Sequence, residues 1–272
     1  MLGRKNAEPV RQPPANQIPR VAKLALSVFI ITKDEEQRLP RTLDALIGWV
    51  GEIVVVDCGS TDRTLEIAKD YGARIVHREF DGYGPQKRFA EQLCAYDWVL
   101  NLDADEVVTP TLKREIIELF PYSEPAPAAY RVKILTVYPG QDRPRPFASD
   151  YNVVRLYHRK AGSYRDHPVF DRVITRVPAR QLRAPIHHFS HVSFRHAIEK
   201  LNTFSDFRAE TTAQRSGAGL IARMAIEFPL SFAKFYLIRR HCFGGWRGLY
   251  FAMTQAFMRT TRIAKMLEKQ QT

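Results

Sequence analysis

The stretch YDWVLNLDADEVVTPTL, residues 96–112, contains the features on which the fold prediction rests. Its first part, Tyr96–Leu102, is mostly apolar, as is typical of a strand that is covered on both faces of a parallel sheet. Two carboxylates, Asp103 and Asp105, follow at the end of this run. Pro110 then opens a predicted helix, because proline is favoured in a first helical turn.

Strand and helix patterns alternate through the residues before this stretch. Three further apolar runs predict strands at Leu24–Ile31, Glu52–Val56 and Ala73–Val76. Helices are predicted at Pro40–Trp49, Arg63–Tyr71, Pro85–Ala95 and Pro110–Phe120. This alternation predicts an α/β fold with an open, mostly parallel sheet and flanking helices. Such sheets bind ligands beyond the carboxyl ends of their strands, where Asp57 and Asp103 stand.

The second half of the chain is less regular and becomes helical near its end. Strands are predicted at Tyr130–Val137 and Asn152–His158, with shorter ones at Val169–Ile174 and Gln181–Ile186. Helical spacing of apolar residues begins at Ser193, and 220–269 predicts two helices around Gly244 and Gly245. We expect three parts: a flexible, basic, proline-rich arm (1–22), an α/β domain with the candidate site (23–192) and an amphipathic helical appendage (193–272).

The charge of the chain is strongly positive. Among 272 residues, 41 are Lys or Arg and 29 are Asp or Glu, which gives a net charge of +12. This balance favours an acidic partner, such as a nucleic acid, an anionic membrane surface or a phosphorylated substrate. No apolar run is long and uncharged enough to predict a transmembrane helix or a secretory signal.

The carboxylate pair Asp103 and Asp105 suggests a metal site. Two carboxylates with an open coordination sphere suit Mg²⁺ or Mn²⁺ held jointly with a diphosphate. The alternative is an acidic loop that precedes a helix, where negative charge is favourable in any protein. Such a pair is common, so the residues alone favour the alternative.

Two turns add polar groups to the same predicted edge of the sheet. Asp57–Asp62 reads DCGSTD, and this turn suits recognition of a base or ribose. The alternative is a plain turn that ends in a helix cap. Asp81–Arg88 reads DGYGPQKR, in which two glycines and two cations favour close approach to a phosphate. The cations oppose the dipole of the helix that begins there, which favours a ligand over a plain helix start.

Three motifs in this order resemble those of glycosyltransferase family 2. They read SVFIITKDEEQRLPRTLDAL (27–46), EIVVVDCGSTDRTLEIAKDYGARIVHREFDGYGPQKRFA (52–90) and DWVLNLDADEVVTPTL (97–112). The branch most similar to them is the lipopolysaccharide core β-glucosyltransferases. The chain departs from that branch at five places: Asp34 and Arg88 replace Asn, Cys58 replaces Ser, and Phe170 and Asp171 replace the His and Glu of a Val-His-Glu motif.

The resemblance implies a GT-A fold, a divalent cation (Mg²⁺ or Mn²⁺) and inversion at the anomeric carbon of a UDP-sugar, with glucose as the sugar. Matched by position, Asp105 is the principal metal ligand, Asp103 faces ribose or metal, and His188 is a further metal or diphosphate ligand. The remaining matched residues would bind the nucleotide sugar, and they are Thr32, Glu35, Asp57, Lys87 and Arg88.

An inverting transfer needs a carboxylate that accepts a proton from the attacking hydroxyl. Asp171 keeps the carboxylate of the family motif and is the predicted base, with Asp150 and Asp166 as alternatives. His167 could substitute for the His that Phe170 lacks. Each of these acids could instead be a loop carboxylate paired with a nearby arginine.

The helical C-terminal region combines aromatic and basic residues. This combination favours an amphipathic surface that rests on an anionic membrane and presents the enzyme to a lipid-linked glycan such as lipopolysaccharide core. The expected location is then the inner face of the cytoplasmic membrane. Ordinary packing against the α/β domain, with solvated basic faces, is the alternative.

Two other functions are alternatives to sugar transfer. A sugar nucleotidyltransferase would be expected to have a glycine-rich basic loop after the first strand, whereas the chain reads ITKDEEQR there. A non-enzymatic nucleic-acid binder is suggested by charge alone, but the cations are spread over the whole chain. The sequence therefore favours the glycosyltransferase.

Overall fold

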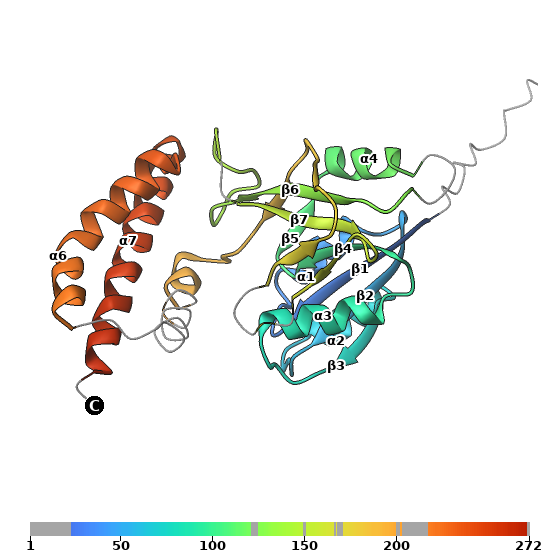
Figure 1. Ribbon diagram of the computed structural model, residues 1–272, viewed down its shortest axis with the longest axis horizontal. Coiled ribbons are helices and arrows are strands. Elements are labelled where there is room, and N and C mark those ends of the chain that lie inside the picture. The colour runs from blue at the N-terminus through green and yellow to red at the C-terminus, as the bar shows by residue number, and fades with distance from the viewer. Residues whose placement is uncertain are drawn as a thin grey trace, which may run out of the picture.

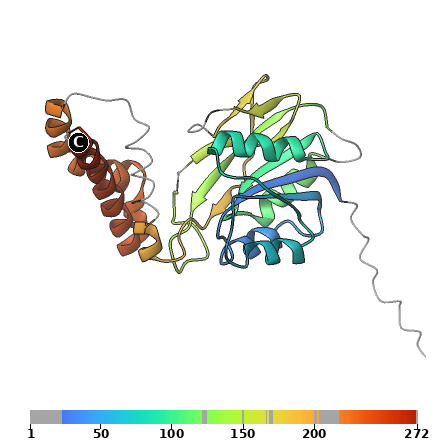
Figure 2. The same ribbon diagram turned by 90° about the horizontal axis from the view of Figure 1, so that it is seen from below.

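The computed structural model describes residues 23–120, 125–148, 151–165, 167, 171–199, 202 and 217–270. The predicted arm, 1–22, lies outside the described residues. An α/β body and a helical hairpin lie side by side (Figures 1 and 2). The body contains the sheet, and the hairpin is the last part of the chain.

The first half of the body is a parallel sheet with helices on its faces, as the sequence predicts. Its strands are β1 (Leu24–Thr32), β2 (Val50–Asp57), β3 (Arg74–His77) and β4 (Trp98–Asp103). The helices between them are α1 (Leu39–Asp44), α2 (Thr64–Asp70) and α3 (Tyr83–Leu93). Helix α1 is shorter than predicted, because the chain leaves the helix at Ala45 and enters turns before β2.

The second half adds both antiparallel and parallel strands to the sheet, and a separate pair of strands beside it. It contains β5 (Glu106–Val108), α4 (Pro110–Glu118), β6 (Ala129–Thr136), β7 (Tyr151–His158), β8 (Gly162–Tyr164), β9 (Val173–Thr175), β10 (Arg180–Gln181) and β11 (Ile186–His188). The strand order is β3-β2-β1-β4-β7-β6-β11-β5, with β10 beside β6 and β8 paired separately with β9. The single strand predicted at 181–186 is wrong. The structure has two short strands there, which pair with different parts of β6.

The sheet buries apolar side chains on both faces. On one face, Val28 and Ile30 of β1 pack with Leu39 and Leu43 of α1. On the other, Phe29 belongs to a cluster that α3 covers. Burying each such side chain stabilises the fold by roughly 1.5–3 kcal/mol, so the sheet is a rigid base for residues at its edges.

The C-terminal hairpin has the two helices that the sequence predicts. Helix α6 (Gly217–Ala233) continues through a π-helical turn, η1 (Lys234–Ile238), and a 3₁₀ turn, η2 (His241–Gly244), into α7 (Gly245–Glu268). Leu220, Ile263 and Met266 form a small core between α6 and α7. Within the described residues, no helix is both long and apolar enough to span a membrane.

Candidate active site

Three parallel strands place their last residues together at one edge of the sheet. Thr32 at the end of β1 is in register with Asp57 at the end of β2. Ile31 is in register with Asp103 at the end of β4. Residues 25 to 72 positions apart in the chain therefore meet at this edge, which we call the rim.

Asp57 is the centre of one part of the rim. Its carboxylate accepts hydrogen bonds from the Gly59 and Ser60 amides (2.8 and 3.0 Å), the Ser60 hydroxyl (2.5 Å) and Thr32 Oγ1 (3.3 Å). Burial raises the pKa of Asp57, but these bonds lower it more, so the pKa lies below its ordinary value. Asp57 is thus an ionised acceptor that fixes the turn after β2.

Asp103 lies between two buried cations. Lys87 Nζ is 2.8 Å from Oδ1, and Arg155 Nη2 is 2.9 Å from Oδ2. Lys87 also contacts Asp171 Oδ2 at 2.9 Å, so one ammonium group joins the end of β4 to the predicted base. Arg155 contacts Glu106 at 2.6 Å. The side chains of Lys87 and Arg155 are only 1% and 7% exposed, whereas those of Asp103 and Asp171 are 33% and 45% exposed, so the cations are buried and the two carboxylates reach the surface.

Burial and the neighbouring charges shift the pKa values of this cluster in opposite directions. Burial opposes the charged form of Asp103, but Arg155 and Lys87 outweigh it and hold its pKa well below the ordinary range. Burial likewise opposes the charge on Lys87, but Asp103 and Asp171 raise its pKa overall. For Glu106, burial dominates and raises the pKa to about 7. Asp103 and Lys87 are therefore a fixed ion pair at neutral pH.

Asp105 lies in a second group at the rim. His188 Nε2 is 3.2 Å from Asp105 Oδ1, and Arg38 Nη1 is 3.3 Å from Oδ2. Arg38 also donates to Glu35 Oε1 (2.6 Å) and to the Ser190 carbonyl (3.0 Å). Burial lowers the pKa of His188, but Asp105 raises it overall. The pairing of β11 with β5 brings His188 to this position, because His188 is in register with Glu106.

Asp105 and His188 are the residues of the rim that could hold a metal ion. A carboxylate oxygen and an imidazole nitrogen side by side are donors that Mn²⁺ accepts. His188 Nδ1 is buried and has no hydrogen-bond partner in the described part of the chain, so its side chain is not fixed on both sides. No group of three or more His, Cys, Asp or Glu suited to a metal occurs among the described residues. Asp105 and His188 are therefore two donors of kinds that a divalent cation accepts, and the described residues alone do not complete a metal site.

The remaining predicted residues are placed less closely. Glu35 lies beside Arg38, and Arg88 donates to the Tyr164 carbonyl (3.1 Å). Asp150, Asp166 and Phe170 lie outside the described residues. The backbone at His167 lies very close to Gly84 of α3. A Cβ atom at position 84 would be 2.3 Å from the His167 carbonyl oxygen, so only glycine allows this approach.

Two arginines of the site were not identified from the sequence. Arg38 joins Glu35 to Asp105, and Arg155 joins Asp103 to Glu106. For Arg155 a signal existed: it interrupts the apolar strand YNVVRLYH, and a charge on a buried strand needs partners. Arg38 has no equivalent signal, because one arginine among the charges of KDEEQR is ordinary on a surface.

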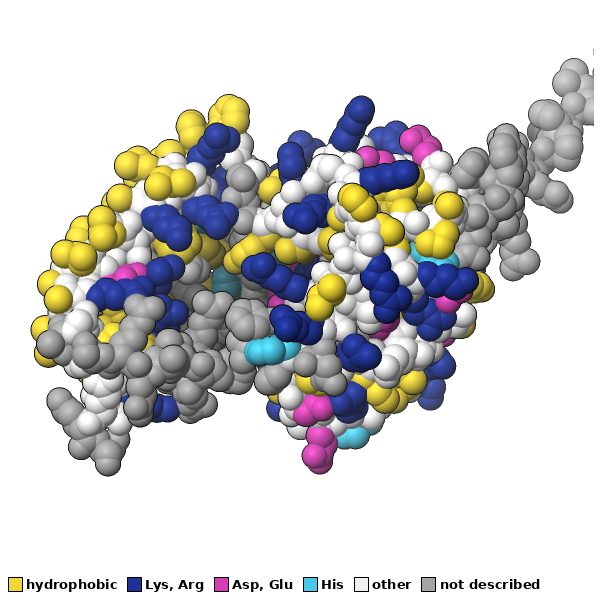
Figure 3. Space-filling view, in the orientation of Figure 1, with side chains coloured by type: hydrophobic (Ala, Val, Ile, Leu, Met, Phe, Trp, Pro, Cys, Tyr) yellow, Lys and Arg dark blue, Asp and Glu magenta, His cyan; other side chains and the backbone are white. Residues whose placement is uncertain are grey.

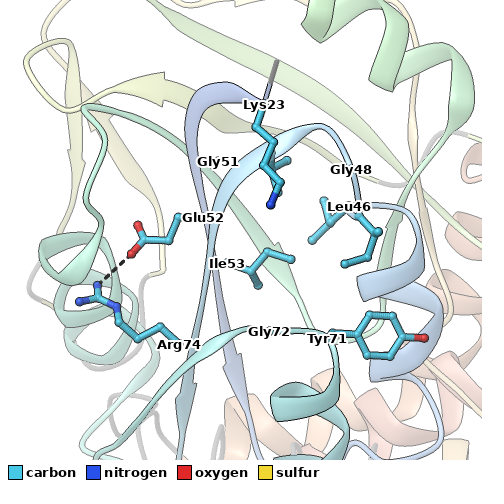
Figure 4. Close-up of a pocket in the computed structure, with 11 residues that line it drawn as sticks. Lys23, Leu46, Gly48, Gly51, Glu52, Ile53, Tyr71, Gly72 and Arg74 are labelled. Carbon is cyan, nitrogen blue, oxygen red and sulfur yellow. Dashed lines mark ion pairs between the residues drawn. The ribbon is translucent and has the colours of Figure 1, made fainter. Parts of the chain in front are cut away.

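A pocket at the opposite edge of the sheet is a different feature. It lies near the amino ends of β1, β2 and β3, and an ion pair between Arg74 and Glu52 (3.3 Å) forms part of its wall (Figure 4). None of the predicted site residues lines it. We therefore place the candidate site at the rim.

Comparison with known proteins identifies the family of the chain. The model of glycosyl transferase family 2 matches residues 27–182, and the chain belongs to this family. It is therefore a glycosyltransferase that takes its sugar from a nucleotide sugar, with the α/β fold of the GT-A type. Family membership confirms the prediction made from the three motifs and decides against a nucleotidyltransferase or a nucleic-acid binder.

Relatives resemble the chain over nearly its whole length. An uncharacterised glycosyltransferase of Rickettsia typhi is 34% identical, over 89% of this chain and 87% of that protein. The lipopolysaccharide core biosynthesis glycosyltransferase LpsC of Rhizobium meliloti is 27% identical, over 92% of this chain and 94% of that protein. A crystal structure of TarS from S. aureus covers 90% of this chain and 91% of its own at 14% identity and a TM-score of 0.44, which is too low to carry an argument.

Proposed function

We propose that this protein transfers a sugar, with inversion and with Mg²⁺ or Mn²⁺, from a UDP-sugar to a lipid-linked glycan. Glucose is the proposed sugar, and lipopolysaccharide core is the proposed acceptor. One observation carries the proposal: Asp57, Asp103 and Asp105 converge at the rim, and Lys87 connects Asp103 to Asp171. The rim thereby combines groups for a nucleotide, a cation and a proton in one place.

The nucleotide would bind where the turn after β2 meets the end of β1. The carboxylate of Asp57 is held in one orientation by Ser60 and Thr32, so it is preorganised to accept hydrogen bonds from a base. Asp103 would face the ribose. A nucleoside diphosphate is the kind of acidic ligand that the basic character of the chain favours.

The cation would be held by Asp105 and His188. When bound, it would supply positive charge that offsets the charge developing on the diphosphate leaving group. Arg38 contacts both Asp105 and Glu35, so it would hold the Asp105 carboxylate in place. It is a positioning residue in this proposal.

Asp171 would be the base. The acceptor hydroxyl oxygen attacks the anomeric carbon as the bond from that carbon to the diphosphate oxygen breaks, and the hydroxyl proton passes to the Asp171 carboxylate. Lys87 contacts Asp171 Oδ2 at 2.9 Å, and this contact supports the role because it fixes the carboxylate at the rim. The side chain of Asp171 is 45% exposed, which leaves it accessible to an acceptor.

The acceptor is proposed from the similarity to LpsC, whose name refers to lipopolysaccharide core biosynthesis. A lipid-linked acceptor requires the enzyme to work at a membrane. We propose that the C-terminal region brings it to the inner face of the cytoplasmic membrane, where anionic lipids attract basic surfaces. This part of the proposal is separable from the chemistry at the rim.

A thermal-shift screen with UDP, UDP-glucose and other nucleotide sugars, each with and without Mn²⁺, tests the donor and the metal. Binding to the folded state raises the apparent Tm, and we expect the largest rise for UDP-glucose with Mn²⁺. Equal rises with and without Mn²⁺ would contradict the metal. A larger rise with another nucleotide would contradict UDP, and product analysis by NMR then reports whether the anomeric centre is inverted.

A further inference from the structure

The loop between β6 and β7 meets the turn of the C-terminal hairpin. Phe147 in the loop and Phe243 in the turn have ring centroids 5.0 Å apart. Both rings are nevertheless exposed, at 66% and 52%. Two aromatic side chains from distant parts of the sequence thus form one exposed apolar contact.

Buried polar contacts fix this loop to the turn. Arg145 is buried and donates to the carbonyl oxygens of Arg239 (2.9 Å) and Arg240 (3.4 Å). Tyr138 and His241 share a 2.6 Å hydrogen bond, also buried. Because a buried guanidinium must keep its partners, the turn is held firmly against the α/β body.

More exposed apolar side chains stand within six positions of Phe243 in the chain. Leu237, Ile238 and Trp246 are 62%, 76% and 61% exposed. We call Phe147, Leu237, Ile238, Phe243 and Trp246 together the apolar tip. Figure 3 shows further hydrophobic side chains along the outer edge of the hairpin, with Lys and Arg side chains between that edge and the body. A soluble surface rarely exposes so many large apolar groups together, so the apolar tip is expected to contact a partner.

The charge around the apolar tip identifies the kind of partner. The segment from Phe228 to Leu267 contains no Asp or Glu, and its basic residues are Lys234, Arg239, Arg240, Arg247, Arg259, Arg262 and Lys265. Large apolar side chains in a segment with a net positive charge fit an anionic lipid surface, which accepts the apolar groups between its headgroups and attracts the cations. Trp246 has the side chain most typical of a membrane interface.

The apolar tip is attached close to the rim. Strand β6 ends at Thr136, just before the loop, and Thr136 is in register with His188 of β11. His188 in turn lies 3.2 Å from Asp105. The loop therefore starts at the edge of the sheet where the candidate site lies.

We infer that the apolar tip inserts into an anionic membrane leaflet, and that its rigid attachment sets the orientation of the rim toward lipid-linked acceptors. This inference names the membrane contact within the proposed function and rests on that function for the acceptor. The buried contacts of Arg145 and Tyr138 join the loop and the turn into one rigid unit. Insertion of the apolar tip into a membrane would therefore fix the orientation of the α/β body relative to that membrane.

Vesicle binding tests the inference directly. The full chain is sedimented with two kinds of vesicle. One contains phosphatidylcholine with about 30% phosphatidylglycerol, which imitates an anionic leaflet, and the other contains phosphatidylcholine alone. We expect binding to the anionic vesicles that weakens with salt. The variant Ile238→Ser with Phe243→Ser should lower the partition coefficient at least about 10-fold, since two exposed apolar groups are removed.

The matched control is Ile47→Ser with Leu65→Ser, which removes two exposed apolar side chains from the α/β body. It should bind vesicles as the wild type does. Trp246 adds a second readout, because Trp49 and Trp98 are only 2% and 0% exposed. Anionic vesicles should therefore shift the tryptophan emission to the blue, and brominated lipids should quench it.

Three results would overturn the inference: no binding of the wild type to anionic vesicles, equal binding by the Ile238 and Phe243 variant, or an unchanged tryptophan emission. A change in oligomeric state of that variant, without vesicle binding by the wild type, would assign the apolar tip to a second copy of the chain. Sugar transfer to a soluble acceptor is measured in parallel and should be unchanged in the variant. Failure of the membrane contact is thereby distinguished from failure of the proposed chemistry.

Discussion

The rim and the C-terminal hairpin place their charges in opposite ways. At the rim, Lys87, Asp103 and Arg155 lie in a cluster of buried and half-buried side chains, where acids and bases contact each other directly. In the hairpin, basic side chains outnumber acidic ones by nine to two over residues 217–270, and large apolar side chains are exposed. The first arrangement holds groups in fixed positions, and the second offers a surface to a partner.

The difference follows from the cost of removing a charge from water. A buried ion requires partners at defined distances, so a buried cluster cannot easily rearrange. An exposed cation is solvated and interacts over a distance that salt limits to about 10 Å. We conclude that the rim holds side chains in fixed positions, whereas the hairpin offers a surface for contact with a partner. Each of the following changes tests one of these two regions.

The largest effect is expected from Asp105→Asn at the rim. Loss of the carboxylate would remove the principal proposed metal ligand, and kcat should fall about 10³-fold or more. Sugar transfer from UDP-glucose in the presence of Mn²⁺ measures the fall. The Mn²⁺-dependent rise in Tm with UDP should also disappear.

Asp97→Asn is the matched control for this change. Asp97 lies directly before β4, at the other end of the strand, and pairs with Arg159 at 2.8 Å. It should retain transfer within about twofold, because an exposed ion pair contributes little. If Asp105→Asn kept activity like that of Asp97→Asn, the rim would not be the metal site.

A smaller effect is expected from Asp171→Asn. Without the base, kcat should fall about 10²- to 10⁴-fold, while UDP and Mn²⁺ still raise the Tm. Both values are measured on the same preparation, so loss of chemistry is separated from loss of donor binding. Loss of the UDP-dependent rise in Tm would show instead that Asp171 serves the donor, through its contact with Lys87.

The parallel half of the fold could be predicted because its strands are covered on both faces and read as apolar runs. The four predicted strands, of which Tyr96–Leu102 is the clearest, correspond to β1, β2, β3 and β4. Short strands such as β10 and β11 could not be predicted, because their pairing with β6 is decided by distant contacts and not by local pattern.

The site residues at the ends of the parallel strands could be predicted, and those that depend on distant contacts could not. Asp57, Asp103 and Asp105 stand at the ends of predictable strands, so their convergence follows from the topology of a parallel sheet. Arg38 and Arg155 were missed, because their roles depend on which side chains they contact across 67 and 52 positions of the chain. Spacing in a sequence does not contain that information.

Arg155→Met tests how far the rim depends on buried pairing. The change leaves the buried Glu106 without its cation and the partly exposed Asp103 with Lys87 alone, and the free energy of unfolding should fall by roughly 3 kcal/mol. Urea denaturation measures the loss. Arg159→Met is the control, since Arg159 pairs with the half-exposed Asp97 and should cost no more than about 1 kcal/mol. Equal losses would mean that the buried ion pairs of the rim contribute no more to the free energy of unfolding than an exposed ion pair does.

The smallest effect is expected from Glu227, the acid at which the hairpin most resembles the rim. Its carboxylate accepts hydrogen bonds from Arg259 (2.6 Å), Ser231 (2.8 Å) and Arg223 (2.9 Å). Burial raises the pKa of Glu227, but these bonds outweigh it and lower the pKa to about 2. The pairing therefore stabilises the fold above the ordinary pKa of 4.5, and this contribution is lost as the pH falls toward 2.

Glu227→Gln should lower the free energy of unfolding by on the order of 2 kcal/mol at pH 7, since one pKa unit corresponds to about 1.4 kcal/mol and partial solvation reduces the full value. Denaturant unfolding of wild type and variant at pH 7 and pH 3 measures the difference, which should shrink by about half or more at pH 3. The exposed Glu268→Gln serves as the control and should show a smaller difference at both pH values. A difference for Glu227→Gln that stays constant would mean that its charge is not what stabilises the hairpin, and the rim alone would then depend on paired buried acids.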